Sequence, residues 1–444
     1  MARDVMARRR ILVPAALADR PLRVGVLVDL LWTPTAGGHV KSWERLARAA
    51  LSAPEALELT VHFQGTTPSR HILGSNVRYE MHPPVFSTAR LPFLSHIPAH
   101  TDLARYHRRL ASRLVIDGAA DGLVRDRYDV LHTTDGAFSF ARTAARTSAS
   151  RNLPLVTSVH TDTARYTRIF TAATIERLVG QGTLSRVLVD WLGLARFAEK
   201  RMRRRLDAHL RRCAFVLLSR GDDWSRLAAL LGLDRIGRLR RGIEHRFFDP
   251  ARRDRVWLEA RLGIPRDRCL VICVGRVDRS KNVLTLMTAL RQLLDRGLPV
   301  HLLCAGLGPD REVVRAQLGE HATCPGVIDP ETLARAYASA DLCAQPSAIE
   351  EISNAVLEAL TSGVPVLVTD ASGSEHLVID GETGLVVRGG VEDWVAALSA
   401  LVTDPQRRQR MGRAARALAL REIPTCRQVL LEDLLPIWRR AAVP

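Results

Sequence analysis

The sequence predicts an α/β protein with two doubly wound parallel sheets, one in each of two domains, and a cleft between the domains. Three observations support this fold class. Short apolar segments alternate with helical segments through most of the 444 residues. This alternation breaks near residues 244–254 and then restarts. The hydrophobic content of 47% and charged content of 25% are typical of a globular chain that is long enough for two or three domains.

The first half contains a series of short apolar runs that we interpret as strands. They are Leu22–Leu30, Leu57–Phe63, Asn76–Met81, Tyr128–His132, Leu155–Val159, Ala214–Ser219 and Leu239–Gly242. Helical patterns are expected at Val40–Leu51, at Thr101–Gly118 and over the long basic segment Arg165–Arg212.

The second half repeats the alternation with shorter helices. The expected strands are Cys269–Val274, Val300–Ala305, Val327–Ile328, Asp341–Gln345, Val364–Val368 and Gly384–Val387. A helix from about Ser353 to Ser362 precedes the fifth of these strands, where Gly363 and Pro365 end it.

These patterns divide the chain into four parts. Residues 1–20 are expected to form a basic N-terminal tail, and residues 21–244 a first Rossmann-like domain. Residues 245–424 are expected to form a second Rossmann-like domain. Residues 425–444 are expected to form a C-terminal helix that packs back towards the first domain.

Targeting signals and cysteine usage predict a cytoplasmic protein. The apolar run Ile11–Ala15 is too short for a secretory leader, and no run approaches the ~20 residues of a membrane span. The seven cysteines lack metal-like spacing, so we interpret them as reduced core residues.

The net charge of +17 predicts a polyanionic neighbour. Nucleic acid is the weakest candidate, because aromatic residues make up 5% and do not interleave with a basic stripe. Residues 196–212 form a basic amphipathic helix with an apolar stripe that includes Met202, Leu206 and Leu210. This helix either lies on the anionic inner face of a membrane, which would make the protein peripheral there, or packs its stripe on the domain core.

Polar and glycine residues gather where strands of the second half end. Arg276 follows the strand that ends at Val274, and Lys281 begins the next helix. Two fixed cations at this edge of a parallel sheet suit a diphosphate. Gly306 lies in a glycine turn after another strand, and Glu350 and Glu358 flank the start of a helix, where anions are favoured.

The first half offers weaker signals of the same kind. Gly37 and Gly38 form a turn between a strand and a helix, without the third glycine of a dinucleotide fingerprint. His160 stands at the C-terminal end of a strand, where polar side chains face the ligand crevice of an α/β sheet.

The combination over residues 265–390 resembles glycosyltransferase family 4, the retaining transferases of GT-B architecture. Its elements are Gly-Arg-Val-x3-Lys-Asn from Gly275, Ala-Gly-x-Gly-Pro from Ala305, and Glu-x7-Glu from Glu350, followed by Ser-Gly-Val-Pro-Val. Asn354 and the pair Thr161-Asp162 are closest to the mannosyl- and sulfoquinovosyltransferase-like branch.

The resemblance implies a hexosyl transfer from a UDP- or GDP-linked sugar to a lipid or glycan acceptor, with retained anomeric configuration and without a metal or other cofactor. The implied catalytic residues are His160, Glu350, Arg276 and Lys281. The implied donor-binding residues are Gly37, Gly38, Arg276, Lys281, Gly306, Ile328, Glu350, Ser353, Asn354 and Glu358.

One departure from the family pattern supports an alternative function. Where the family usually has Gly-Phe-Gly or Thr-Phe-Gly after the first glutamate, this chain has Glu351-Ile352-Ser353. The missing glycine and the added carboxylate alter a region that faces phosphate or sugar. The alternative is therefore a catalytically weak or inactive scaffold that acts as a binding or regulatory protein.

Overall fold

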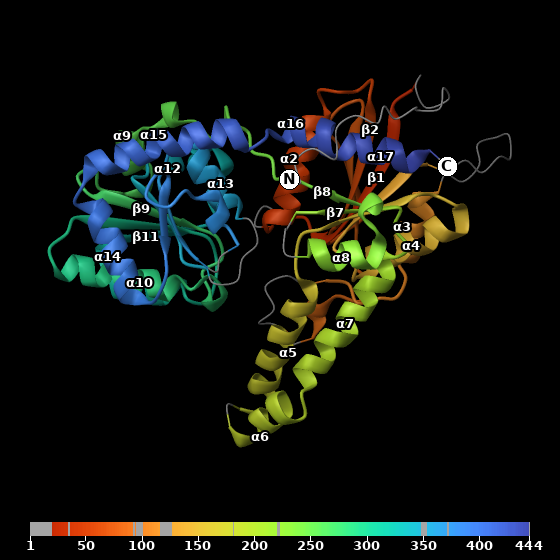
Figure 1. The fold of residues 1–444 in the computed structure, drawn as a ribbon, viewed down its shortest axis with the longest axis horizontal. Coiled ribbons are helices and arrows are strands. Elements are labelled where there is room, and N and C mark those ends of the chain that lie inside the picture. The colour runs from red at the N-terminus through yellow and green to blue at the C-terminus, as the bar shows by residue number, and fades with distance from the viewer. Residues whose placement is uncertain are drawn as a thin grey trace. The chain divides into compact units, whose positions relative to one another are not determined.

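The computed structural model describes residues 20–33, 36–91, 94, 101–115, 127–180, 182–219, 223–347, 353–370 and 373–443. These residues form two compact units (Figure 1). Unit 1 contains the described residues up to Arg240 and those from Arg427 onward, and unit 2 contains Arg241–Cys426. Among the described helices, none has the length and apolar content that crossing a bilayer requires.

Unit 1 is built on an eight-stranded sheet with the strand order β3-β4-β2-β1-β5-β6-β7-β8. All neighbours are parallel except β3 and β4, which are antiparallel. The strands are β1 Leu22–Leu31, β2 Leu57–Gln64, β3 Ser69–Ile72, β4 Val77–His82, β5 Val130–Thr134, β6 Leu155–Val159, β7 Phe215–Leu218 and β8 Ile236–Arg238.

Helices cover this sheet, and the C-terminal segment returns to it. The helices of the N-terminal part are α2 Gly38–Ala50, α3 Arg108–Leu114, α4 Ser139–Arg151, α5 Thr163–Val179, α6 Thr183–Arg186, α7 Leu194–Leu210 and α8 Trp224–Leu231. The C-terminal segment contains α16 Cys426–Gln428, a π-helical stretch at Val429–Leu434 and α17 Leu435–Ala442. Trp438 of α17 is fully buried, and α17 contacts β5 and β6.

Unit 2 is built on a six-stranded, fully parallel sheet with the order β11-β10-β9-β12-β13-β14. The strands are β9 Cys269–Val274, β10 Val300–Ala305, β11 Ala322–Gly326, β12 Leu342–Gln345, β13 Val366–Thr369 and β14 Gly384–Val387. The helices are α9 Arg255–Leu262, α10 Val283–Asp295, α11 Arg311–Leu318, α12 Pro330–Ser339, α13 Asn354–Thr361, α14 Val391–Val402 and α15 Pro405–Glu422. Two apolar cores fill the space between the sheet and these helices.

Several expected elements differ from the structure. The helix expected over Thr101–Gly118 begins only at Arg108. Asp102, at the expected helix start, instead pairs its backbone with Ser87, and its carboxylate accepts the backbone N–H groups of Val85 and Phe86. The strand expected at Leu239–Gly242 lies earlier in the sequence, at Ile236–Arg238, as β8. The Arg240 N–H donates to Asp433 instead of continuing the strand ladder.

The third difference lies at the edge of the unit 2 sheet. The strand expected at Val327–Ile328 lies five residues earlier, as β11. This strand contains Pro325, which an edge strand tolerates because one side of its backbone needs no partner.

The long basic segment Arg165–Arg212 is a hairpin rather than one helix. α5 and α7 pack against each other, and α6 and a π-helical turn at Val187–Trp191 connect them (Figure 1). Met202 and Leu206 of the apolar stripe are partly buried, and Leu210 belongs to the core of unit 1. The stripe of residues 196–212 therefore covers protein, as the core alternative predicts.

The seven cysteines are all buried, and none forms a disulfide. Burial raises the pKa of the Cys343 thiol to about 12, so this sulfur stays protonated at neutral pH.

Candidate functional site

The loop that follows β9 holds both predicted cations of unit 2. Arg276 donates a hydrogen bond to Ser280 Oγ at 3.0 Å and lies 3.6 Å from the Asp278 carboxylate. Asp278 also accepts the backbone N–H groups of Ser280 and Lys281, at 2.9 and 3.3 Å. One carboxylate thus shapes a short turn that carries both cations at the carboxyl end of a central strand.

The loop after β10 lies against the loop after β9. Val277 N–H donates to the Leu307 carbonyl at 2.9 Å, and Gly275 N–H donates to the Ala305 carbonyl at 3.0 Å. A Cβ on Gly306 would lie 1.7 Å from the Gly275 carbonyl oxygen, and Gly306 has a φ of 153°. The structure therefore explains this glycine by loop packing, independently of its expected place at the donor.

Hydroxyl groups join further loops to this edge of the sheet. Ser347, which follows β12, donates to the Ser280 carbonyl at 3.4 Å. Thr369, at the end of β13, donates to the Ser347 carbonyl at 2.5 Å. The sequence reasoning missed these residues, although Ser and Thr at strand ends are a detectable signal.

The expected residues of α13 lie at its N-terminal half. Ser353 is the N-cap residue and is buried, and its N–H donates to Ser374 Oγ at 3.0 Å. Asn354 accepts a hydrogen bond from Arg241 at 3.4 Å. Glu358, one turn further along, is 4% exposed.

Glu358 lies among buried polar groups of the unit 2 core. Burial, and then the nearby Glu358 charge, hold the pKa of Tyr337 well above its usual range. Ile328, in the loop after β11, packs its partly buried side chain against the same core. Glu350 lies outside the described residues.

In unit 1, the glycine turn opens directly onto a helix. α2 begins at Gly38, and its N-cap Gly37 has no side-chain cap and open space around its Cβ position. The φ of Gly37 is −68°, so its backbone conformation does not require glycine.

His160 follows β6 and is buried in a hydrogen-bond network. Its N–H donates to Asp135 at 2.7 Å, and its Nε2 lies 2.8 Å from Ser158 Oγ. The other Asp135 oxygen lies 3.4 Å from His39 Nδ1, and the rings of His39 and His160 are 5.1 Å apart. Asp135 has a φ of 47°, an uncommon conformation that aims its carboxylate at two strand-end loops.

The sequence reasoning missed Asp135 and His39. Asp135 directly follows β5, so the rule that identified His160 from the end of its strand applies to Asp135 as well. His39 stands one residue after the glycine pair on α2.

A chain of hydrogen bonds connects His160 to the C-terminal helix. Trp438 Nε1 donates to His132 Nδ1 at 3.0 Å, because an indole N–H can only donate. Burial lowers the pKa of His132 to about 3, so its ring is neutral and its one proton is on Nε2. That proton points to Ser158 Oγ at 2.9 Å, so the Ser158 hydroxyl proton is available to donate to His160 Nε2 at 2.8 Å. When Ser158 donates in this way, a neutral His160 carries its proton on Nδ1.

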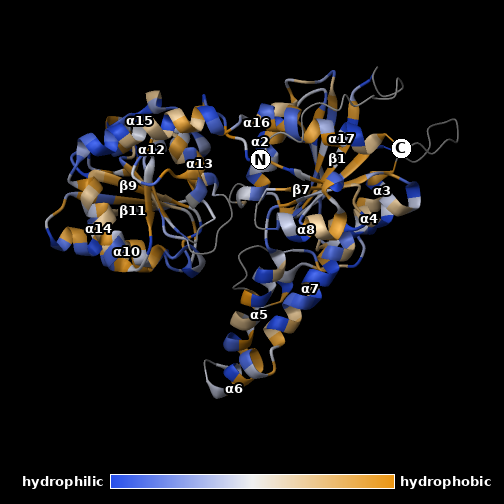
Figure 2. Cartoon of the chain, in the orientation of Figure 1, coloured by the Kyte–Doolittle hydropathy of each residue, from blue (hydrophilic) through white to orange (hydrophobic). Residues whose placement is uncertain are grey.

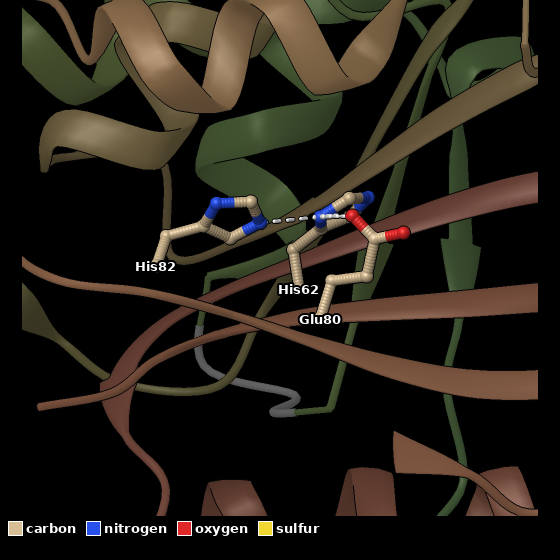
Figure 3. Close-up of side chains that lie close together, drawn as sticks. All are labelled: His62, Glu80 and His82. Atoms are coloured by element: carbon tan, nitrogen blue, oxygen red, sulfur yellow. Dashed lines mark hydrogen bonds and ion pairs between the residues drawn. The ribbon is translucent and has the colours of Figure 1, made fainter. Parts of the chain in front are cut away.

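A second polar cluster lies elsewhere in unit 1, on β2 and β4. His62, Glu80 and His82 bring their polar atoms together, as metal ligands do (Figure 3). His62 Nδ1 and His82 Nε2 share a hydrogen bond of 2.9 Å, and Arg127 donates to Glu80 at 2.5 Å. The His62–His82 hydrogen bond occupies a ring nitrogen of each histidine, and Arg127 pairs with the Glu80 carboxylate, so we interpret the cluster as a buried hydrogen-bond network.

A pocket of about 610 Å³ opens beside this network. Its lining includes Arg70, Glu80, His82, Arg109 and Arg113. None of the predicted site residues is in this lining, so the pocket and the candidate site are separate features of the described chain.

Comparison with known proteins identifies unit 2. Residues 258–418 match the family model for glycosyl transferases group 1. The second unit is a group 1 glycosyltransferase domain. The expected resemblance to family 4 is therefore confirmed.

Two curated relatives share part of the chain. A D-inositol 3-phosphate glycosyltransferase from Nocardia farcinica is 38% identical over 180 residues, which cover 37% of this chain and 40% of the relative. A GDP-mannose-dependent alpha-(1-6)-phosphatidylinositol monomannoside mannosyltransferase from Mycobacterium tuberculosis is 33% identical over 181 residues, 38% of this chain and 46% of that protein. The chain thus spans less than half the length of these two relatives.

The solved structures extend the similarity to the whole fold. A sucrose-phosphate synthase from Thermosynechococcus elongatus aligns with 94% of this chain and 98% of its own, at 19% identity and a TM-score of 0.66. The glycosyltransferase domain thus belongs to a chain with two Rossmann-like units of the GT-B type, which confirms the predicted fold class.

Proposed function

We propose that the protein is a retaining glycosyltransferase that moves a hexosyl group from a UDP- or GDP-linked sugar to a lipid or glycan acceptor. The observation that carries the proposal is the turn after β9, which places Arg276 and Lys281 together at the carboxyl edge of a parallel sheet. Ligands of open α/β sheets bind at this edge. A diphosphate is the part of such a donor that two cations suit best.

In this proposal the two cations act on the leaving nucleotide. Negative charge develops on the diphosphate as the glycosidic bond breaks, and Arg276 and Lys281 stabilise it without a metal ion. The acceptor hydroxyl attacks the anomeric carbon from the face that the diphosphate leaves. A phosphate oxygen takes the acceptor proton, so configuration is retained.

The remaining site residues keep their expected roles as part of the proposal. Glu358 accepts from the ribose hydroxyls, and Glu350 accepts from the transferred sugar. Ser353, Asn354, Gly306 and Ile328 complete the donor side. In the first domain, Gly37 and Gly38 bind the donor, and His160 lies near the anomeric carbon.

The names of the relatives support the acceptor class. One relative is named for inositol phosphate and the other for a phosphatidylinositol mannoside. An acceptor with sugar-like hydroxyls, free or attached to a lipid, is therefore the substrate class that we propose.

A second candidate function is a binding or regulatory scaffold with little transfer activity. The Ser353 N–H, at the start of α13, already donates to Ser374 Oγ within the protein. One backbone donor at this helix N-terminus is thus satisfied without a ligand, and the chain lacks the usual glycine there.

Calorimetry with UDP- and GDP-sugars, followed by a transfer assay, separates the two functions. For the wild-type protein we expect donor binding and transfer. In Lys281→Ala we expect donor affinity to fall about tenfold to a hundredfold, because a charge-assisted bond to phosphate is lost. The matched control is Arg413→Ala, an exposed cation on α15. Donor binding without transfer would support the scaffold, and unchanged binding in Lys281→Ala would contradict the proposed donor site.

A further inference from the structure

The far end of the α5–α7 hairpin exposes a cluster of large apolar side chains. Trp191 is 82% exposed, Phe197 65% and Leu178 63%. We call this cluster the hairpin tip. Its members are Leu178, Val179, Leu184, Val187, Trp191, Leu192, Leu194 and Phe197.

The hairpin tip is distinct from the apolar stripe that covers the core. Figure 2 shows apolar residues along α5, α6 and α7, on a hairpin that extends away from the sheet of unit 1. Single exposed apolar side chains are ordinary, but here eight of them lie within the 20 residues from Leu178 to Phe197 at one end of a hairpin. Such a cluster marks contact with another apolar phase or protein.

The charges beside the hairpin tip favour one occupant. Lys200, Arg201, Arg204 and Arg205 are exposed on α7, just beyond Phe197. From Thr163 to Arg212 the sequence has twelve Lys or Arg and four Asp or Glu, a net charge of +8.

The nearby carboxylates do not cancel this excess. Glu199 lies 3.6 Å from Arg168 and 3.4 Å from Arg203, so its charge is paired within the hairpin. Glu176 and Asp190 remain exposed near the tip. Arg177, Arg186 and Arg196 are exposed in the same stretch and outnumber them.

We propose that the hairpin tip inserts into the interface of an anionic lipid bilayer, with the basic residues of α7 against the phosphate layer. The tip supplies an apolar end and the next turns supply cations, which is the order of layers in a membrane interface. An indole side chain prefers this boundary, and long basic side chains reach from it to the headgroups. The proposal does not depend on glycosyl transfer.

This surface differs from the membrane contact expected from sequence. The membrane contact expected from sequence was the apolar stripe of residues 196–212. In the structure, that stripe packs on protein. The exposed apolar residues lie mainly before residue 196, and only their basic border lies within that helix.

Flotation of the full chain with vesicles tests the proposal without a donor or acceptor. We expect binding to phosphatidylglycerol–phosphatidylcholine vesicles, weaker binding to phosphatidylcholine alone, and further weakening with added salt. The variant Leu184→Ser/Trp191→Ser/Phe197→Ser should bind at least about tenfold more weakly. The matched control, Ile72→Ser/Leu233→Ser/Val256→Ser, removes equally exposed apolar side chains elsewhere and should bind like the wild type.

Two further measurements make the outcome decisive. Brominated acyl chains should quench the fluorescence of Trp191, which is the part of the wild-type signal that Trp191→Phe lacks. This quenching reports insertion of the hairpin tip in the folded wild-type protein. Sedimentation of the wild type and the tip variant tests whether a second copy of the chain covers the hairpin tip instead of a membrane. Wild-type affinity in the tip variant would overturn the proposal. A dimer that the tip variant abolishes, without vesicle binding, would also overturn it and assign the hairpin tip to a second copy of the chain.

Discussion

The position of the ring proton of His160 is linked to Trp438, a side chain far along the sequence. Its Nε2 accepts from Ser158, whose orientation depends on His132, which in turn accepts from Trp438. The indole can only donate, so it fixes the direction of the first hydrogen bond and the tautomer of a neutral His132. We predict that the tautomer of the proposed catalytic histidine depends, through Ser158, on a helix at the other end of the chain.

Replacing Trp438 tests this relay. Trp438→Phe keeps a buried ring but removes the indole N–H that donates to His132 Nδ1. We expect a mixture of His160 tautomers in ¹⁵N spectra, and transfer reduced about tenfold with donor KM unchanged. Trp394→Phe is a matched control, because the buried Trp394 N–H has no hydrogen-bond partner among the described residues. A single Nδ1–H tautomer in Trp438→Phe would contradict the relay.

At the scale of elements, the edge of the unit 2 sheet is built by loops that bond to one another. The loops after β9 and β10 share backbone hydrogen bonds, and Ser347 and Thr369 extend the connection to β12 and β13. Arg276 and Lys281 therefore lie on a loop that neighbouring loops hold in place by hydrogen bonds. This limits the conformational entropy that the loop loses when a charged ligand binds.

Gly306→Ala tests how closely two of these loops must approach. The new Cβ would overlap the Gly275 carbonyl, which is backbone and cannot rotate away. We expect the free energy of unfolding to fall by about 2–4 kcal/mol in urea denaturation. The control is Gly297→Ala, which has a positive φ of 76° but no atom near its Cβ, and should lose only about 1 kcal/mol. Equal losses in both variants would mean that backbone conformation, and not the close approach, sets the cost.

At the scale of the whole molecule, both units bury neutral histidines. Burial lowers the pKa of His132 to about 3, and the pKa values of His82, His209 and His301 to about 4. In the unfolded chain these rings titrate near 6.5, so below that pH the unfolded state binds more protons than the folded state. Stability therefore falls as the pH decreases from 6.5 towards 4 and is unaffected by these groups above 6.5.

Thermal melting across this pH range measures the effect in each unit. We expect Tm to fall on acidification, and His301→Gln to reduce that slope, because the amide keeps a partner for Thr323 without a titrating group. His376→Gln, an exposed position in the same unit, is the control and should keep the wild-type slope. A His301→Gln slope equal to that of the wild type would show that this ring is not a source of the acid sensitivity.

The sequence alone determined the fold class and much of the candidate donor edge. Apolar periodicity and turn residues are local signals, and they were sufficient for most strands and for placing Arg276 and Lys281 at a strand end. The strand at Ile236–Arg238 was expected too late in the sequence, because the distant Asp433 takes the Arg240 N–H. The start of α3 was expected too early, because Asp102 is bonded to the backbone of Val85 and Phe86.

Only the tertiary structure decided the rest. It folded Arg165–Arg212 back on itself, so one apolar stripe became core while a second apolar cluster remained exposed. It also brought Asp135, His39 and Trp438 into the network around His160. The physical reason is shared: burial and hydrogen-bond pairing depend on which distant segments meet, and a local pattern does not contain that information.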